Sequence, residues 1–177
     1  MPSLGTISGK APYVVPRTHS KPGPKTVVVR FKDTAIALTD EAGVVAYGGL
    51  KFLDLPAGAV AIHGATANLA VTKSSAGVNA DWDGDFGVGT VTASNNATLS
   101  STEQNVIPTT STPQASSGAT TATGQSTAAV YLDGTSTAVD LYVNFLVDDA
   151  DHDVTSTACN LILNGTITVS YTLLGDY

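Results

Sequence analysis

VDLYVNFLVDD, residues 139–149, carries the strongest strand signal in this chain. Alternate positions form one apolar set, which consists of Leu141, Val143, Phe145 and Val147. The positions between them form a mixed set, which consists of Tyr142, Asn144 and Leu146. A period of two residues is typical of a β-strand that turns one face toward a core. We therefore predict a strand here whose apolar set faces inward.

Other short apolar or alternating runs indicate further strands, separated by glycine, proline and aspartate. We expect them within residues 26–32, 34–40, 44–55, 59–65, 68–74 and 78–94. In residues 160–177 the pair Asn164-Gly165 is a strong hairpin signal, so we predict two strands joined there. About nine strands and no long helix predict an all-β fold, a sandwich or barrel of antiparallel strands.

The length and composition favour one folded domain after an N-terminal extension. The 177 residues are 42% hydrophobic and only 13% charged, which disfavours long solvent-facing helices. We take residues 26–177 as that domain. Within it, residues 94–128 include sixteen serines and threonines, and we predict a long loop there. The spacing of Ser100 and Glu103 matches a capping box and predicts a short helix inside that region.

Residues 1–25 hold five of the eight prolines, so we predict an extended arm rather than a helix or a central strand. Six basic residues and no acid lie between Lys10 and Lys32. One interpretation is a solvated tail. The other is a strap that becomes ordered on an acidic partner. Its contact residues would be Lys10, Tyr13, Val14, Val15, Arg17, Lys21 and Lys25.

The net charge of −7 is unevenly distributed along the chain. All eight basic residues lie at or before Lys73, beside four acids, whereas eleven acids and no lysine or arginine follow it. The two parts are therefore electrostatically complementary, within one molecule or between neighbours. A single cysteine, Cys159, allows no intrachain disulfide, which fits a reducing cytoplasm. We expect no secretory signal and no membrane span.

Two acidic stretches are candidates for a metal site. The first contains Asp148, Asp149, Asp151, His152 and Asp153, which could hold a divalent cation, support acid–base chemistry or solvate a loop end. We favour the solvated loop. The second contains Asp81, Asp83 and Asp85, as in the opening of a calcium loop, but Phe86 and Thr92 occupy the positions of its glycine and glutamate. We favour a strand with a polar outer face.

The other chemically reactive side chains lack suitable neighbours. His19 lies in the arm, and His63 lies in an apolar strand, where we expect it to be packed rather than to bind a metal. Cys159 has no nearby base in the sequence, so we expect a buried, unreactive thiol. We therefore expect no catalytic residue, no metal, no cofactor and no small-molecule substrate, and the chain is not interpreted as an enzyme.

Several segments resemble a family of small virion-associated proteins of tailed phages. They are AGVVAYGGLKFLDLPAGAV (42–60), NLAVTKSSAGVNADWDGDFGVGTVTAS (68–94), ATLSSTEQNVIP (97–108) and all of residues 139–177. Similar proteins are interpreted as capsid decoration, or cement, proteins. The resemblance implies a jelly-roll sandwich, usually a homotrimer, that binds the major capsid protein on the outside of the virion and is assembled in the host cytoplasm.

One alternative from another functional class remains open. A fibre or lectin-like jelly-roll module that binds host glycans would use the same fold. Such binders usually expose aromatic side chains, and here aromatic residues are only 6% of the chain, with Trp82 the one tryptophan. Nucleic acid is an unfavourable partner, because the acidic domain would repel phosphates.

Overall fold

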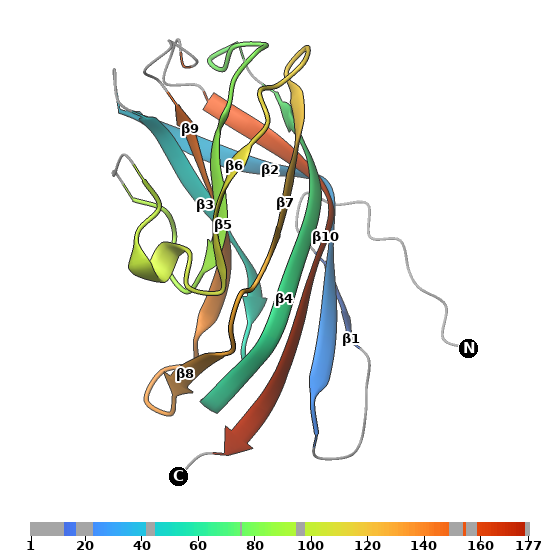
Figure 1. The fold of residues 1–177 in the computed structure, drawn as a ribbon, viewed down its shortest axis with the longest axis vertical. Coiled ribbons are helices and arrows are strands. Elements are labelled where there is room, and N and C mark those ends of the chain that lie inside the picture. The colour runs from blue at the N-terminus through green and yellow to red at the C-terminus, as the bar shows by residue number, and fades with distance from the viewer. Residues whose placement is uncertain are drawn as a thin grey trace, which may run out of the picture.

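The computed structural model describes residues 13–16, 23–41, 45–74, 76–94, 98–148, 154 and 159–175. The elements in these residues are ten strands and one short 3-10 helix, and the fold is all-β as predicted (Figure 1). The strands are β1 (Tyr13–Pro16), β2 (Lys25–Glu41), β3 (Val45–Asp54), β4 (Gly58–Lys73), β5 (Gly84–Gly89), β6 (Ile107–Thr112), β7 (Ala119–Gln125), β8 (Val130–Gly134), β9 (Asp140–Asp148) and β10 (Cys159–Gly175), and the helix η1 is Ser101–Glu103. Among the described residues, no helix is long and apolar enough to cross a membrane.

The strand order is that of a jelly roll. The hydrogen-bonded path runs β6-β5-β9-β3-β2-β10-β4-β7, and every pair is antiparallel. Apart from β1 and β8, eight strands form two four-stranded layers, β2-β10-β4-β7 and β3-β9-β5-β6, which face each other in Figure 1. These layers hold the first, eighth, third and sixth strands and the second, seventh, fourth and fifth, which is the jelly-roll arrangement of two Greek keys.

Strand β2 joins the two layers. Residues 25–38 of β2 pair with β10, and its last three residues, Thr39–Glu41, pair with β3 in the other layer. The sequence predicted two strands here, residues 26–32 and 34–40, and that prediction was wrong. Asp33 has a positive φ of 49° but remains inside the strand, and its backbone N–H donates to Asn164 Oδ1 at 2.9 Å. The aspartate therefore marks an irregularity in one long strand rather than a turn.

The hairpin predicted at Asn164-Gly165 is also absent, because β10 continues through it. Gly165 has a φ of 129°, and the pairing with β2 shifts register between Leu163 and Gly165. A side chain at Gly165 would collide with the backbone of Asn68 on β4. Since β2 and β4 pair with β10 on both sides of this point, the glycine accommodates a bulge in a central strand.

Two further expectations are corrected in the same way. Residues 59–65 and 68–74 form one strand, β4, and the serine- and threonine-rich residues 94–128 contain η1, β6 and β7 instead of one long loop. Threonine is a good strand former, and in β7 the buried Ala122 alternates with the exposed Thr121 and Thr123. Because both faces of β7 carry small side chains, the difference in hydropathy between them is small, and the sequence carries only a weak strand signal.

The core lies between the two layers and contains the predicted face of β9. Leu141, Val143, Phe145 and Val147 are all fully buried, which confirms their inward orientation. The rings of Phe145 and Phe86 pack with centroids 5.8 Å apart. Trp82 is also fully buried, and its indole N–H donates to the carbonyl of Gly118 at 3.2 Å. Cys159 is buried as predicted.

The opposite face of β9 is buried too, because the chain between β5 and β6 folds back over it. Figure 1 shows η1 on the outer side of the β3-β9-β5-β6 layer. Asn144, which has no exposed surface, accepts a hydrogen bond from Ala93 N–H at 2.9 Å and donates to the carbonyls of Val91 (2.9 Å) and Glu103 (2.7 Å). We call residues 90–94 and 98–106 the covering segment.

Glu103 holds the covering segment in shape through the predicted capping box. Its carboxylate accepts hydrogen bonds from the backbone and hydroxyl of Ser94 (2.8 and 2.6 Å) and of Ser100 (2.7 and 3.1 Å). Burial by itself raises the pKa of Glu103, but the hydrogen bonds from Ser100 and Ser94 outweigh it, so the pKa lies below its usual 4.5.

This network predicts acid-sensitive stability. A carboxyl group whose pKa is lower in the folded state stabilises the fold above its unfolded pKa of about 4.5, and that contribution disappears as the pH falls through the lower folded value. We expect Glu103→Gln to be less stable than the wild type at pH 7, and the difference to narrow toward pH 3. Urea unfolding between pH 3 and pH 7 measures the stability difference and how it changes with pH. As a control, Asn68→Ala at an exposed, uncharged position should keep the wild-type pH dependence. A constant difference between Glu103→Gln and wild type would contradict the prediction.

Candidate functional site

The arm proposed from the sequence meets the folded domain at the free edge of β2. Strand β1 pairs antiparallel with β2, with Tyr13 opposite Arg30 and Pro16 opposite Val27. The predicted contact residues Tyr13, Val14 and Val15 therefore lie in an edge strand, and their side chains are outside the described residues. The predicted residues Lys10, Arg17 and Lys21 also lie outside them, and Lys25 is the half-buried first residue of β2.

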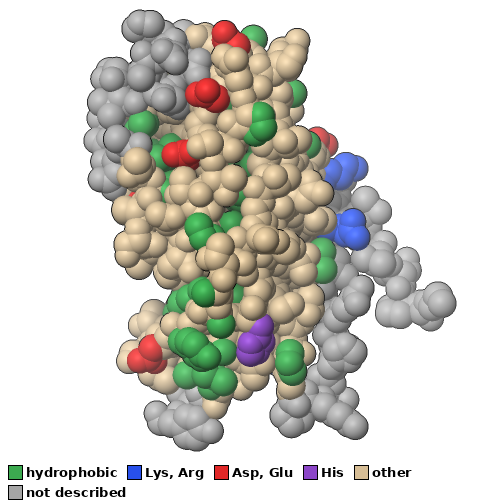
Figure 2. All heavy atoms as spheres, viewed as in Figure 1, with side chains coloured by type: hydrophobic (Ala, Val, Ile, Leu, Met, Phe, Trp, Pro, Cys, Tyr) green, Lys and Arg blue, Asp and Glu red, His purple; other side chains and the backbone are tan. Residues whose placement is uncertain are grey.

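The basic residues of β2 form a charged edge beside β1. Arg30 and Lys32 are exposed, and neither they nor Lys25 makes an ion pair within the described part of the chain. We call these three residues the basic edge. The lysine and arginine side chains visible in Figure 2 lie on the side of the molecule where Figure 1 draws β1 and β2. The exposed Asp33 directly follows this edge in the sequence.

The other two described basic residues are occupied by interactions within the chain. Lys51 Nζ contacts Asp54 at 2.8 Å and Asp140 at 3.4 Å. The hydrogen bond with Asp54 and the charge of Asp140 raise the pKa of Lys51. Lys73 Nζ donates to the carbonyl of Val78 at 2.6 Å. The positive charge available to a partner therefore lies, among the described residues, on β2.

The two acidic stretches have different outcomes. Asp149, Asp151, His152 and Asp153 lie outside the described residues, and Asp148 is described only as the last backbone position of β9. The prediction of a strand carrying Asp81, Asp83 and Asp85 was wrong for the first two, which precede β5; Asp85 lies in β5 and accepts a hydrogen bond from Ser111 Oγ at 2.9 Å. Within the described part of the chain, no group of three or more histidine, cysteine or acidic residues is placed to hold a metal ion.

The outer face of the β2-β10-β4-β7 layer is rich in hydroxyl and amide groups. Thr166, Asn68 and Thr123 lie in register across β10, β4 and β7, and Thr168, Thr66 and Gln125 form the next row. The described side chains of β4, β7 and β10 include one charged group, Lys73 at the end of β4. Over β10, β4 and β7 this sheet face therefore offers hydrogen-bonding groups with little net charge, whereas β2 at its edge carries Arg30 and Lys32.

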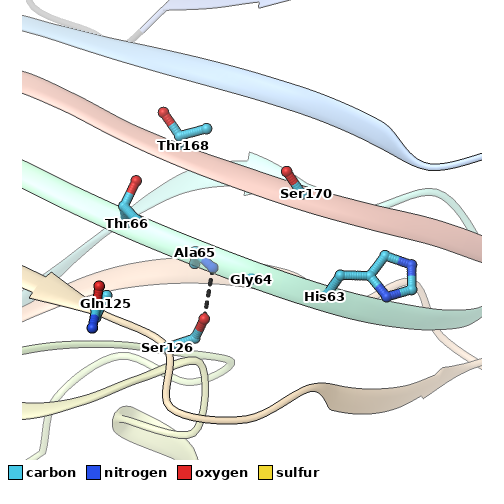
Figure 3. Close-up of a pocket in the computed structure, with 8 residues that line it drawn as sticks. All are labelled: His63, Gly64, Ala65, Thr66, Gln125, Ser126, Thr168 and Ser170. Carbon is cyan, nitrogen blue, oxygen red and sulfur yellow. Dashed lines mark hydrogen bonds between the residues drawn. The ribbon is translucent and has the colours of Figure 1, made fainter.

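A pocket interrupts this face where β7 ends and β8 begins to pair with β4. Its volume is about 340 Å³, and Figure 3 shows its lining. The lining residues are His63, Gly64, Ala65, Thr66, Gln125, Ser126, Thr168 and Ser170, and we call this site the Gly64 pocket. In Figure 3 the residues of β4 lie between those of β10 and the Gln125–Ser126 segment.

His63 was expected to be packed in the protein, and this was wrong. It is exposed, because the pairing of β4 with β10 shifts between Ser170 and Tyr171 and leaves His63 at the bulge. Its Nε2 lies 2.7 Å from Thr172 Oγ1, within hydrogen-bond distance. Sequence reasoning missed this pocket. The signal available was the adjacent pair His63-Gly64 within the otherwise apolar run of residues 59–65, and such a pair can mark a bulge.

Comparisons with protein-family models, with curated proteins and with solved structures found no match.

Proposed function

We propose that this chain is a structural protein of a phage virion that decorates and stabilises the capsid by binding the major capsid protein. The basic edge beside β1 is the observation that carries this proposal. Two of its three positive charges, Arg30 and Lys32, are exposed on an otherwise acidic protein, at the position where the arm joins the sheet. A partner that fits it presents carboxylates and an extended segment or sheet edge.

The jelly roll supports this proposal as a rigid scaffold. Its two layers share a core, and the covering segment is held to one layer by buried hydrogen bonds. A cement protein requires such rigidity, because a lattice contact gains affinity when its surfaces are already ordered before binding. On this proposal the protein acts on the capsid exterior and assembles there with copies of itself, as a homotrimer.

The proposed attachment combines the arm and the basic edge. The arm residues Lys10, Arg17 and Lys21, together with Lys25 of the basic edge, contact acidic groups of the capsid, and Tyr13, Val14 and Val15 fill apolar grooves. Proline reduces the entropy lost when the arm becomes ordered, since much of its backbone is already restricted. Exposed charges contribute little individually and are screened by salt. We therefore expect binding to weaken steadily as ionic strength rises.

Removal of residues 1–22 is expected to leave a folded domain that no longer binds purified capsids lacking this protein. Co-sedimentation with such capsids measures binding, and circular dichroism checks the fold. The double change Arg30→Glu and Lys32→Glu should weaken binding at least about tenfold, because two attractive contacts become repulsive. Lys51→Ala is the matched control, since Lys51 is paired with acids of its own chain. If both variants bind as tightly as the wild type, the proposed attachment is wrong.

A further inference from the structure

We infer that the Gly64 pocket is a binding site for one unit of a neutral saccharide. This inference does not rest on capsid binding, because it concerns a different part of the surface. At about 340 Å³ the pocket is at the lower end of the range for ligand sites, roughly 300–1,000 Å³, and matches a sugar ring better than a larger cofactor.

The polar groups around the pocket are suited to sugar hydroxyls. The side chains of Thr66, Gln125 and Thr168 make no hydrogen bond to other described residues, so their donors and acceptors are available. Ser126 Oγ accepts from Ala65 N–H at 2.8 Å and keeps its own proton to donate. Hydroxyl groups both donate and accept, and a site with hydroxyl, amide and imidazole groups matches that capacity.

The charge of the lining selects against ionic ligands. The pocket is lined by no aspartate, glutamate, lysine or arginine. Among the described basic residues on this sheet face, Arg30 of β2 is nearest in register. It pairs with Thr166, one row away from Thr168 of the pocket. An anionic sugar would therefore lose hydration without a compensating charge, which is unfavourable. A neutral sugar avoids this cost.

Gly64 lies beside the bulge of β4, which is a common place for glycine, and the absence of a side chain there leaves the pocket open. Glycines elsewhere in the sheets are required, since a Cβ at Gly49 or Gly89 would collide with neighbouring atoms. A Cβ at Gly64 would meet only Ser126 Oγ, at an ordinary contact distance of 3.6 Å. The glycine therefore leaves open space over the sheet, and close approach of a ligand to the backbone is one known role of a glycine within a strand.

An exposed aromatic ring lies on the adjoining strand. Tyr131 of β8 is 75% exposed and pairs with Ala61, which also pairs with Thr172, the hydrogen-bond partner of His63. Figure 2 shows hydrophobic side chains on both sides of the histidine. An exposed tyrosine combines an apolar ring with a hydroxyl group, so it can pack against the C–H face of a sugar and donate to its oxygens.

Saturation-transfer NMR on the full chain tests the inference. The probes are glucose, galactose, mannose and N-acetylglucosamine, with glucuronate and glucosamine as charged counterparts. We expect saturation transfer to at least one neutral sugar, with a Kd on the order of millimolar, as is typical of one small ligand. Gly64→Val should raise the Kd at least about tenfold, because the new side chain occupies the pocket. Ala70→Val is the matched control on the same exposed face of β4 and should bind normally.

Two further variants make the test independent of how well Gly64→Val folds. Thr168→Val is nearly the same size and removes one hydroxyl, and Tyr131→Ala removes the exposed ring; each should raise the Kd several-fold. The inference is overturned if no neutral sugar binds, if the charged sugars bind more tightly, or if Gly64→Val, Thr168→Val and Tyr131→Ala all bind as the wild type does.

Discussion

Replacement of Phe145 by alanine is expected to lower the free energy of unfolding by about 3–5 kcal/mol. Phe145 is fully buried in the middle of β9, and its ring packs against Phe86 in the neighbouring strand. Alanine would remove the transfer free energy of the ring and leave a cavity between the layers. Because β3 and β5 both pair with β9, the backbone there cannot collapse easily into the space.

Urea unfolding followed by circular dichroism measures this loss. The matched control is Tyr131→Ala, an aromatic-to-alanine change at a 75% exposed position, which should alter stability by no more than about 0.5 kcal/mol. If Phe145→Ala loses less than about 1.5 kcal/mol, the proposed position of Phe145 in a tightly packed core is wrong.

Replacement of Asn144 by alanine is expected to cost about 3 kcal/mol, because buried partners would lose their hydrogen bonds. The amide of Asn144 joins β9 to the covering segment through Ala93, Val91 and Glu103. Without it, the Ala93 N–H and the Glu103 carbonyl lose their partner in a buried region, and the Val91 carbonyl loses its partner in a partly buried one. The covering segment should then detach locally and expose Leu146 beneath it.

Hydrogen exchange distinguishes this local effect from general destabilisation. The amide of Ala93 donates to Asn144, so its exchange should accelerate more than that of amides in β10. Asn68→Ala is the matched control, since Asn68 is exposed on β4 and makes no hydrogen bond to the described residues. Equal stability of Asn144→Ala and wild type would show that the covering segment does not depend on this side chain.

The sequence predicted the fold class and one core face, but not where the long strands end. The strand in residues 139–149 could be predicted from this segment alone, because alternation is a local signal. Its pairing with β3 and β5 agrees with that signal. Asp33 and Asn164-Gly165 resemble turns locally, yet Asp33 lies within the long β2–β10 pairing and Asn164-Gly165 lies in β10 between β2 and β4, so the sheet accommodates them as irregularities. Whether such a residue ends a strand or lies inside it depends on the neighbouring strands, which are far away in the sequence.

The candidate sites show the same limit. The basic character of β2 follows from composition, but its position beside β1 follows from pairing. The Gly64 pocket combines residues 63–66 of β4, residues 125–126 at the end of β7 and residues 168 and 170 of β10, which are far apart in the chain. A sequence pattern shows which residues are polar, and only the topology shows that they share one surface.

The central position of β10 also determines when the β2-β10-β4-β7 layer can fold. β10 lies between β2 and β4, so each of those strands has one edge without its β10 partner until residues up to 175 have left the ribosome. Until then the nascent chain carries two long strand edges with unpaired backbone groups, which invite pairing with other chains. Pairing between distant segments also makes folding slow. Each copy therefore completes this sheet only once β10 has been made, and in a crowded cell the interval before β10 inserts is when the chain is most exposed to aggregation.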